Sequence, residues 1–322
     1  MLDLTYDYES CVKASERISW KVDDVLPVNA KLDFTRPFLP DQLAGTRGLA
    51  TLGGAPFLDD HARLRLNQIG GNAYLNLFGF VEEYILATMM KHAQAEVFGD
   101  PMNLRALLRF TDEELKHQAL FNRYRDAFER DFQHRCGVLK NAVEVAGVIM
   151  SHSPAAVLLI TLHIELMTQQ HYVECVKDAP MDPLFQSLLK HHWLEESQHA
   201  RIDALELDKI ARTLSSEKRD LAVDEYLGIL DAFDGLLAEQ AKLDIESLST
   251  VLGRTFNEAE ADAIRASQLA AYRKTFIWYG MTNPTFVSTT KKLSPSKAVT
   301  VAERALKFAS SERPSQIPTA RA

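Results

Sequence analysis

Apolar residues recur every three to four positions through most of this chain, and short clusters of proline and glycine interrupt the pattern. A spacing of three to four residues is typical of amphipathic α-helices, because it places the apolar side chains on one face of the helix. The alternation of apolar and polar residues that indicates β-strands is nearly absent. We therefore predict an all-α fold, with a four-helix bundle at its centre and additional helices around it.

The interruptions divide the chain into three parts. Residues 1–58 contain many prolines and glycines and are predicted to form an arm that packs on the main body. Residues 59–309 are predicted to form a single helical domain, with the core bundle in residues 72–214 and the extra helices in residues 216–309. The last part, residues 310–322, is a polar tail.

The predicted helices of the bundle cover residues 72–97, 103–132, 155–177 and 182–214. Further helices are predicted at residues 8–22, 138–151, 216–248, 257–278 and 296–309. Gly70 and Gly71 are expected to interrupt the helical region that Asp59 begins. Gly280 and Pro284 are expected to end the helix that starts at residue 257.

The motif Glu-x-x-His occurs twice in the predicted bundle, as Glu114–His117 and as Glu196–His199. Residues three positions apart are neighbours on one helix face, so each pair presents a carboxylate and an imidazole together. A single pair of this kind on an exposed face usually has no function. Two such pairs indicate a metal site when the other two helices of the bundle also supply a carboxylate.

Each of the other two bundle helices has a glutamate within its apolar stripe. Glu165 lies in the apolar run 158–167, where an unpaired carboxylate would be costly to bury and metal coordination would remove that cost. In the first bundle helix, Glu82 falls inside the stripe and Glu83 falls at its border. We choose Glu82, and Glu83 stays the alternative.

The spacing of these glutamates predicts two similar helical hairpins. Glu82 precedes Glu114 by 32 residues, and Glu165 precedes Glu196 by 31 residues. Two Glu-x-x-His helices with one glutamate from each of two further helices form a carboxylate-bridged di-metal site. Carboxylate and imidazole favour divalent iron or manganese. The sequence therefore predicts two iron ions, with manganese as the alternative.

A third histidine narrows this prediction. His192 lies four residues before Glu196 and seven before His199, so the three side chains share one helix face. The general pattern is that of ferritin-like di-iron proteins. With the extra histidine, the chain resembles the arylamine N-oxygenase family, typified by p-aminobenzoate N-oxygenase. The ligand set that the resemblance implies is Glu82, Glu114, His117, Glu165, His192, Glu196 and His199.

The resemblance covers residues 60–210 and implies a ferritin-like di-iron oxygenase. Such an enzyme uses dioxygen as co-substrate, oxidises the nitrogen of a small organic amine and takes electrons from an external donor. A homodimer is a further expectation from the family. C–H hydroxylation and oxidative cleavage stay open as alternative reactions, because similar sites support them.

Several residues near these ligands are candidates for supporting roles. Asp203 is expected to contact a ligand histidine, and His191 is expected to be solvated. Glu113 and Glu195 are expected either at the surface or in contact with the ligands. Arg123 and Arg201 are candidates to bind a substrate carboxylate. The residues expected to pack near the site, or to line a pocket there, are Thr161, Thr168, Tyr172, Tyr84 and Trp193.

Composition excludes several classes of function. The formal net charge is -8 and no long basic face appears, so we expect no nucleic-acid partner. The longest apolar run, residues 155–162, is too short to span a bilayer, and the N-terminus lacks the pattern of a signal peptide. Cys11, Cys136 and Cys175 are scattered, as expected for free thiols in the cytoplasm.

Three other functions compete with an oxygenase. A metal-storage bundle would not need the added helices after residue 215. A radical-carrying subunit would need a tyrosine near the metals, such as Tyr84 or Tyr172. An interaction protein without metal would leave the ligand-type residues unexplained.

Overall fold

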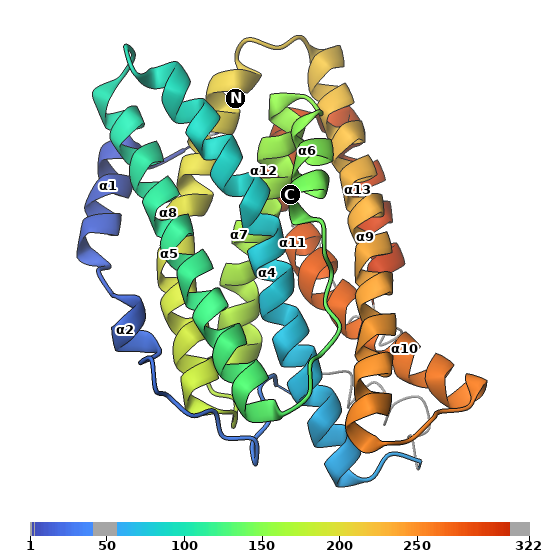
Figure 1. Cartoon of the computed structure of the whole chain (residues 1–322). Helices are drawn as coiled ribbons and strands as arrows, with labels where there is room; N and C mark the ends of the chain where they lie inside the picture. Colours follow the sequence, from blue (N-terminus) through green and yellow to red (C-terminus); the bar gives the residue numbers. More distant parts are fainter. Residues whose placement is uncertain (1, 3, 41–56, 310–322) are drawn as a thin grey trace.

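The computed structural model describes residues 2, 4–40 and 57–309, and all regular secondary structure in these ranges is helical (Figure 1). The predicted all-α fold is therefore confirmed. The predicted tail and much of the loop region of the arm lie outside the described residues. The four bundle helices are α4 (Asp60–Glu96), α5 (Pro101–Phe132), α7 (Pro154–His171) and α8 (Pro183–Ala211).

Each bundle helix begins at a side chain that caps its free backbone N–H groups. Three of the four then have proline as the first helical residue, where a missing N–H costs nothing. The prolines that break the hydrophobic pattern are thus the starts of helices. The capping residues are Asp59, Asp100, Ser153 and Asp182.

The bundle consists of two hairpins, as the spacing of the glutamates predicts. Helix α4 packs along α5, and α7 packs along α8. Helix α7 continues into a π-helical turn, Tyr172–Val176, before the chain turns back. Helix α5 also packs on α8, so the two Glu-x-x-His helices are neighbours.

Different elements cover the two sides of the bundle. The arm supplies α1 (Tyr8–Arg17) and α2 (Val22–Val25), which pack on α5 and α8. On the opposite side, α9 (Ser216–Leu252) packs on α4 and α7, and α6 (Ala142–Met150) packs mainly on α4 (Figure 1). The Glu-x-x-His pair of helices therefore faces the arm, and the other pair faces α6 and α9.

The remaining helices follow α9 in the sequence, and α11 and α12 among them pack on α7. They are α10 (Glu258–Tyr272), a π-helical turn (Arg273–Trp278), α11 (Tyr279–Thr282), α12 (Pro284–Leu293), a 3-10 turn (Pro295–Lys297) and α13 (Ala298–Phe308). Helix α12 was not predicted, and the predicted helix 8–22 is in fact α1 and α2. Among the described residues, none of the helices combines the length and apolar character needed to cross a bilayer.

The prediction that Gly70 and Gly71 interrupt a helix is wrong. Helix α4 runs through both. The glycines stand at positions where other segments approach the helix closely and leave little room for a side chain. A Cβ at Gly71 would lie 2.8 Å from the Cβ of Phe38 in the arm. A Cβ at Gly70 would lie 3.3 Å from the Gln268 amide nitrogen of α10.

Gly280 also lies inside a helix and does not end it. A Cβ at this position would lie 2.3 Å from Nε2 of His163, so the glycine makes room for the imidazole ring. His163 donates from Nε2 to the carbonyl of Phe276 at 2.9 Å. The helix ends at Thr282, before the proline that starts α12.

Candidate metal centre

The seven predicted ligands converge in the middle of the bundle. None is more than 3% exposed, although all are polar or charged. Nitrogen and oxygen atoms of six of them, all except Glu165, form two overlapping groups whose members lie within 4.8 Å of one another. The first group is Glu82, His117, His192 and Glu196, and the second is Glu114, His117, Glu196 and His199.

Glu196 and the histidines provide the closest contacts in this cluster. Nδ1 of His199 lies 2.8 Å from Oε2 of Glu196 and 3.0 Å from Oε1 of Glu114. It lies 4.0 Å from Oε2 of Glu165, which places that carboxylate at the edge of the second group. His192 contacts Glu196 directly, and its Nε2 lies 3.1 Å from Oε1 of Glu82.

Several buried atoms of the cluster have no hydrogen-bond partner among the described residues. They are Oε2 of Glu82, Oε2 of Glu114 and Nδ1 of His117. Buried polar atoms in folded proteins are almost always satisfied, since an unpaired one is costly. Metal ions would satisfy these atoms, and a donor set of carboxylate oxygens and imidazole nitrogens fits iron.

Burial and mutual repulsion disfavour ionisation of some carboxylates. Burial raises the pKa of Glu82 to about 8, and the neighbouring Glu114 adds to the rise. Burial and Glu196 raise the pKa of Glu165 well above its usual value. At His192 the carboxylates of Glu196 and Glu82 outweigh burial and raise the pKa to about 10. Divalent cations bound among these carboxylates would remove the penalty on their ionisation.

Two further carboxylates fix the orientation of the ligand histidines. Oε2 of Glu195 accepts a hydrogen bond from Nε2 of His117 at 3.0 Å, and Oε2 of Glu113 accepts one from Nε2 of His199 at 2.9 Å. Because each Nε2 carries the proton, each Nδ1 is free to bind metal. Both carboxylates are buried, so Glu113 and Glu195 contact the ligands and do not lie at the surface.

The arm completes this outer layer. Ser15 of the arm donates to Glu113, and Lys116 of α5 donates to Glu195. Trp20 stacks on the His117 ring with centroids 6.0 Å apart, and the Lys116 ammonium lies 4.1 Å from the Trp20 ring centroid. No local pattern in the sequence marks Ser15 or Trp20, because their roles depend on where the arm packs.

The structure decides the choice between Glu82 and Glu83. Glu82 lies in the cluster, whereas Glu83 is half-buried on another face of α4 and belongs to neither group. The expectation that His191 is solvated is wrong. Its ring is half-buried, lies 5.7 Å from the Trp20 ring and donates to the Ser187 carbonyl at 2.7 Å.

The predicted contact of Asp203 with a ligand histidine is not a hydrogen bond. Both carboxylate oxygens of Asp203 are buried without a hydrogen-bond partner among the described residues. Glu113, not Asp203, accepts the hydrogen bond from Nε2 of His199. Burial raises the pKa of Asp203 well above its usual value, and the His199 imidazole opposes this rise.

The two candidate arginines contact the arm. Arg123 pairs with Asp23 and donates to the Leu26 carbonyl at 3.1 Å, and the Arg201 guanidinium lies 5.6 Å from the Tyr6 ring centroid. Neither is among the residues that line the described cavities. The expectation that they bind a substrate carboxylate therefore has no support in the structure.

The other candidates near the site mainly pack. The hydroxyls of Thr161 and Thr168 donate to backbone carbonyls one helical turn earlier, both at 3.0 Å. Tyr172 stacks on Trp193 with centroids 4.5 Å apart. Tyr84 differs, because its buried hydroxyl has no partner of good geometry among the described residues.

A four-helix bundle with two Glu-x-x-His helices and two glutamate helices around one buried cluster defines the di-metal carboxylate proteins. The family model described as "P-aminobenzoate N-oxygenase AurF" matches residues 16–244, more than half of the chain. The chain therefore belongs to this family. It is a non-haem di-iron oxygenase with dioxygen as co-substrate, and the match includes most of the arm.

Two solved structures illustrate a more distant likeness. An R2-like ligand-binding oxidase with an aerobically reconstituted Mn/Fe cofactor is 14% identical, covers 85% of this chain and 93% of its own, and has a TM-score of 0.45. A variant of an R2-like ligand-binding oxidase is 12% identical over 83% of this chain and 94% of its own, with a TM-score of 0.46. A likeness this distant does not establish shared chemistry. A comparison with curated protein sequences finds no match.

Proposed function

We propose that this oxygenase oxidises the nitrogen of a small organic amine. The position of His192 carries the proposal. Its imidazole lies in the same group as Glu82, His117 and Glu196, and this is the residue that adds a third histidine to the usual two. The description of the matching family model points to the same reaction.

In this proposal the seven clustered residues bind two iron ions, which supply the reduction of dioxygen when an external donor provides electrons. The first oxidation step balances as an amine, dioxygen, two electrons and two protons giving a hydroxylamine and water. Glu113 and Glu195 keep a proton on Nε2 of the ligand histidines, so that Nδ1 stays available. Burial of all seven residues excludes bulk water from the site.

The test combines metal analysis with product analysis. The protein is loaded with iron under anaerobic conditions, reduced, mixed with p-toluidine and exposed to isotopically labelled dioxygen. We expect two irons per chain, and a hydroxylamine or nitroso product that carries the label, detected by mass spectrometry. Label on a ring carbon or on the methyl group would contradict N-oxygenation and favour C–H hydroxylation.

His192→Ala separates this proposal from a general di-iron function. We expect the variant to keep most of its iron and to lose at least tenfold in the rate of nitrogen oxidation. His191→Ala is the matched control, because His191 is adjacent and lies outside both ligand groups. A His192→Ala variant that oxidises the amine as fast as the unaltered protein would contradict the proposal.

A further inference from the structure

A cavity of about 330 Å³ lies between α4, α6, α7 and α9. This volume is within the range of small-molecule sites, about 300–1,000 Å³. Its lining is mainly apolar, includes the rings of Phe80, Tyr84 and Phe233, and contains no aspartate, glutamate, lysine or arginine. His152 is the one histidine in the lining, and its Nδ1 contacts the carbonyls of Val148 and Ile149 at 3.0 and 3.1 Å. The residues that characterise it are Phe80, Tyr84, Ile160, Ile164, Gly228 and Phe233.

The inner end of this cavity lies against the metal centre. Val81 and Ile164 line it, and each directly precedes a clustered glutamate, Glu82 and Glu165. Tyr84 also lines the cavity, is 1% exposed, and has a buried hydroxyl without a partner of good geometry among the described residues.

The outer end of the cavity opens to the surface between α6 and α9. Val148 of α6 is 61% exposed, and Gly228 and Ala232 of α9 are also exposed. These three residues line the same cavity as the buried Tyr84. The cavity therefore connects solvent with the neighbourhood of the metal centre.

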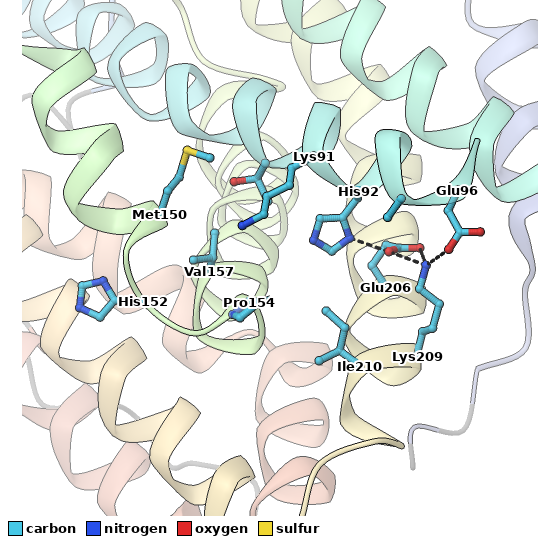
Figure 2. A pocket seen from close by; sticks show the side chains of 12 residues that line it. Lys91, His92, Glu96, Met150, His152, Pro154, Val157, Glu206, Lys209 and Ile210 are labelled. Atoms are coloured by element: carbon cyan, nitrogen blue, oxygen red, sulfur yellow. Dashed lines mark hydrogen bonds and ion pairs between the residues drawn. The ribbon is translucent and has the colours of Figure 1, made fainter. Parts of the chain in front are cut away.

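A neighbouring cavity of about 250 Å³ differs from the first because charged side chains stand among its apolar lining residues (Figure 2). Its walls contain an ion-pair network in which Nδ1 of His92 lies 2.6 Å from Glu206, and the Lys209 ammonium lies 2.7 Å from Glu96 and 2.8 Å from Glu206. These groups satisfy one another. The cavity with charged walls thus offers a poorer environment for an apolar substrate than the cavity lined by Phe80, Tyr84 and Phe233.

We propose that the apolar cavity binds the organic substrate and selects an uncharged aromatic amine of about one ring over an aminobenzoate anion. A carboxylate in this cavity would lose its hydration without a lysine or arginine to pair with, and the Nδ1 of His152 is already engaged with the carbonyls of Val148 and Ile149. An aromatic ring would instead pack on Phe80, Tyr84 and Phe233. The proposal rests on the proposed nitrogen oxidation and specifies its substrate class.

Two glycines of α9 provide a matched test. A Cβ at Gly228 or at Gly235 meets no atom within 4 Å, and both residues are exposed, but only Gly228 lines the cavity. Gly228→Leu fills part of the cavity, and Gly235→Leu makes the same chemical change elsewhere on the helix. Ala232→Leu is a second variant that fills the cavity from another lining position.

Binding of p-toluidine and 4-aminobenzoate to the anaerobic, iron-loaded protein is measured by equilibrium dialysis. We expect p-toluidine to bind at least tenfold more tightly than 4-aminobenzoate. Gly228→Leu and Ala232→Leu should weaken p-toluidine binding at least tenfold, and Gly235→Leu should leave it unchanged. Tighter binding of 4-aminobenzoate, no binding of p-toluidine at millimolar concentration, or unaltered binding in both cavity variants would overturn the proposal.

The same samples distinguish the two proposals when they are exposed to dioxygen. If p-toluidine binds in the cavity and its nitrogen is not oxidised, the assigned cavity stands and the proposed reaction fails. If the nitrogen is oxidised as fast in Gly228→Leu and Ala232→Leu as in the unaltered protein, the reaction stands and the assigned cavity fails.

Discussion

The two sides of the bundle differ in how they treat buried polar groups. On the side of α5 and α8, His117 and His199 face carboxylates at both ring nitrogens, and these carboxylates raise the pKa of both imidazoles. On α7, burial lowers the pKa of His163 to about 4 and that of His171 to about 3, and their hydrogen-bond partners are neutral.

The two sides therefore have different roles: one orients the ligand histidines, and the other encloses an apolar space. The side of α5 and α8 holds the ligand histidines in one orientation, with help from the arm. The side of α4 and α7 is apolar around its neutral histidines, and the cavity lies there. A di-metal oxygenase needs both a rigid ligand set and a dry space for its substrate.

The largest effect is expected from Glu196→Ala. Glu196 belongs to both groups of the cluster, so its removal weakens both metal positions. We expect the variant to retain at most one iron per chain by mass spectrometry and to lose more than about a hundredfold in activity. Glu83→Ala is the control, since Glu83 lies outside the cluster. Retention of two irons in Glu196→Ala would contradict the proposed ligand set.

A smaller effect is expected from Glu195→Gln, which tests the orienting role on the side of α5 and α8. The amide still accepts the Nε2 proton of His117, but its missing charge makes the imidazole a weaker ligand. We expect a loss of about 10–100-fold in iron affinity, measured by competition with a chelator. Glu144→Gln is an exposed control on α6. Equal affinities would show that Glu195 does not act through His117.

The neutral histidine of α7 predicts a dependence of stability on pH. The folded pKa of His163 is about 4, below the usual 6.5, so the unfolded chain binds more protons between these values. The stability that neutral His163 contributes is present above pH 6.5 and is lost as the pH falls toward 4. The full loss is about 3 kcal/mol, since each unit of pKa difference corresponds to about 1.4 kcal/mol.

Urea unfolding of the metal-free protein and of His163→Gln measures this loss. We expect the variant to be less stable at pH 7, because its side chain replaces an imidazole that bonds to both Tyr226 and Phe276. The difference between the two proteins should narrow as the pH falls to 4.5. A difference that stays constant with pH would contradict burial of a neutral imidazole.

The smallest effect is expected from Ser15→Ala in the arm. The Ser15 hydroxyl donates to Glu113 and accepts from Nε of Arg109 at 2.5 Å. Its removal should lower the free energy of unfolding by about 1 kcal/mol and weaken iron binding only a few-fold. Ser10→Ala, at a half-buried position in the same helix, is the control, because the Ser10 hydroxyl bonds to the backbone of the capping residue Asp7 and not to Glu113. A larger loss of iron in Ser10→Ala would place the coupling elsewhere in the arm.

The sequence alone determined the helical fold, the two hairpins and all but one of the predicted ligands, since the first bundle helix offered both Glu82 and Glu83. These features follow from local rules: helical periodicity assigns a face to each side chain, and Glu-x-x-His places two ligand-type residues on one face. Even the starts of the bundle helices follow from an N-cap residue, with proline next to it in three of the four. A local pattern identifies them because its members are close in the chain.

Only the tertiary structure decided between Glu82 and Glu83, and only it showed that Ser15 and Trp20 support the ligand layer. It also showed that Gly71 serves a close approach by the arm and that Arg123 binds the arm. The cavity, too, is visible only in the tertiary structure, since four helices distant in the chain enclose it. Such features depend on which segments meet in space, and periodicity within one helix does not specify its partners.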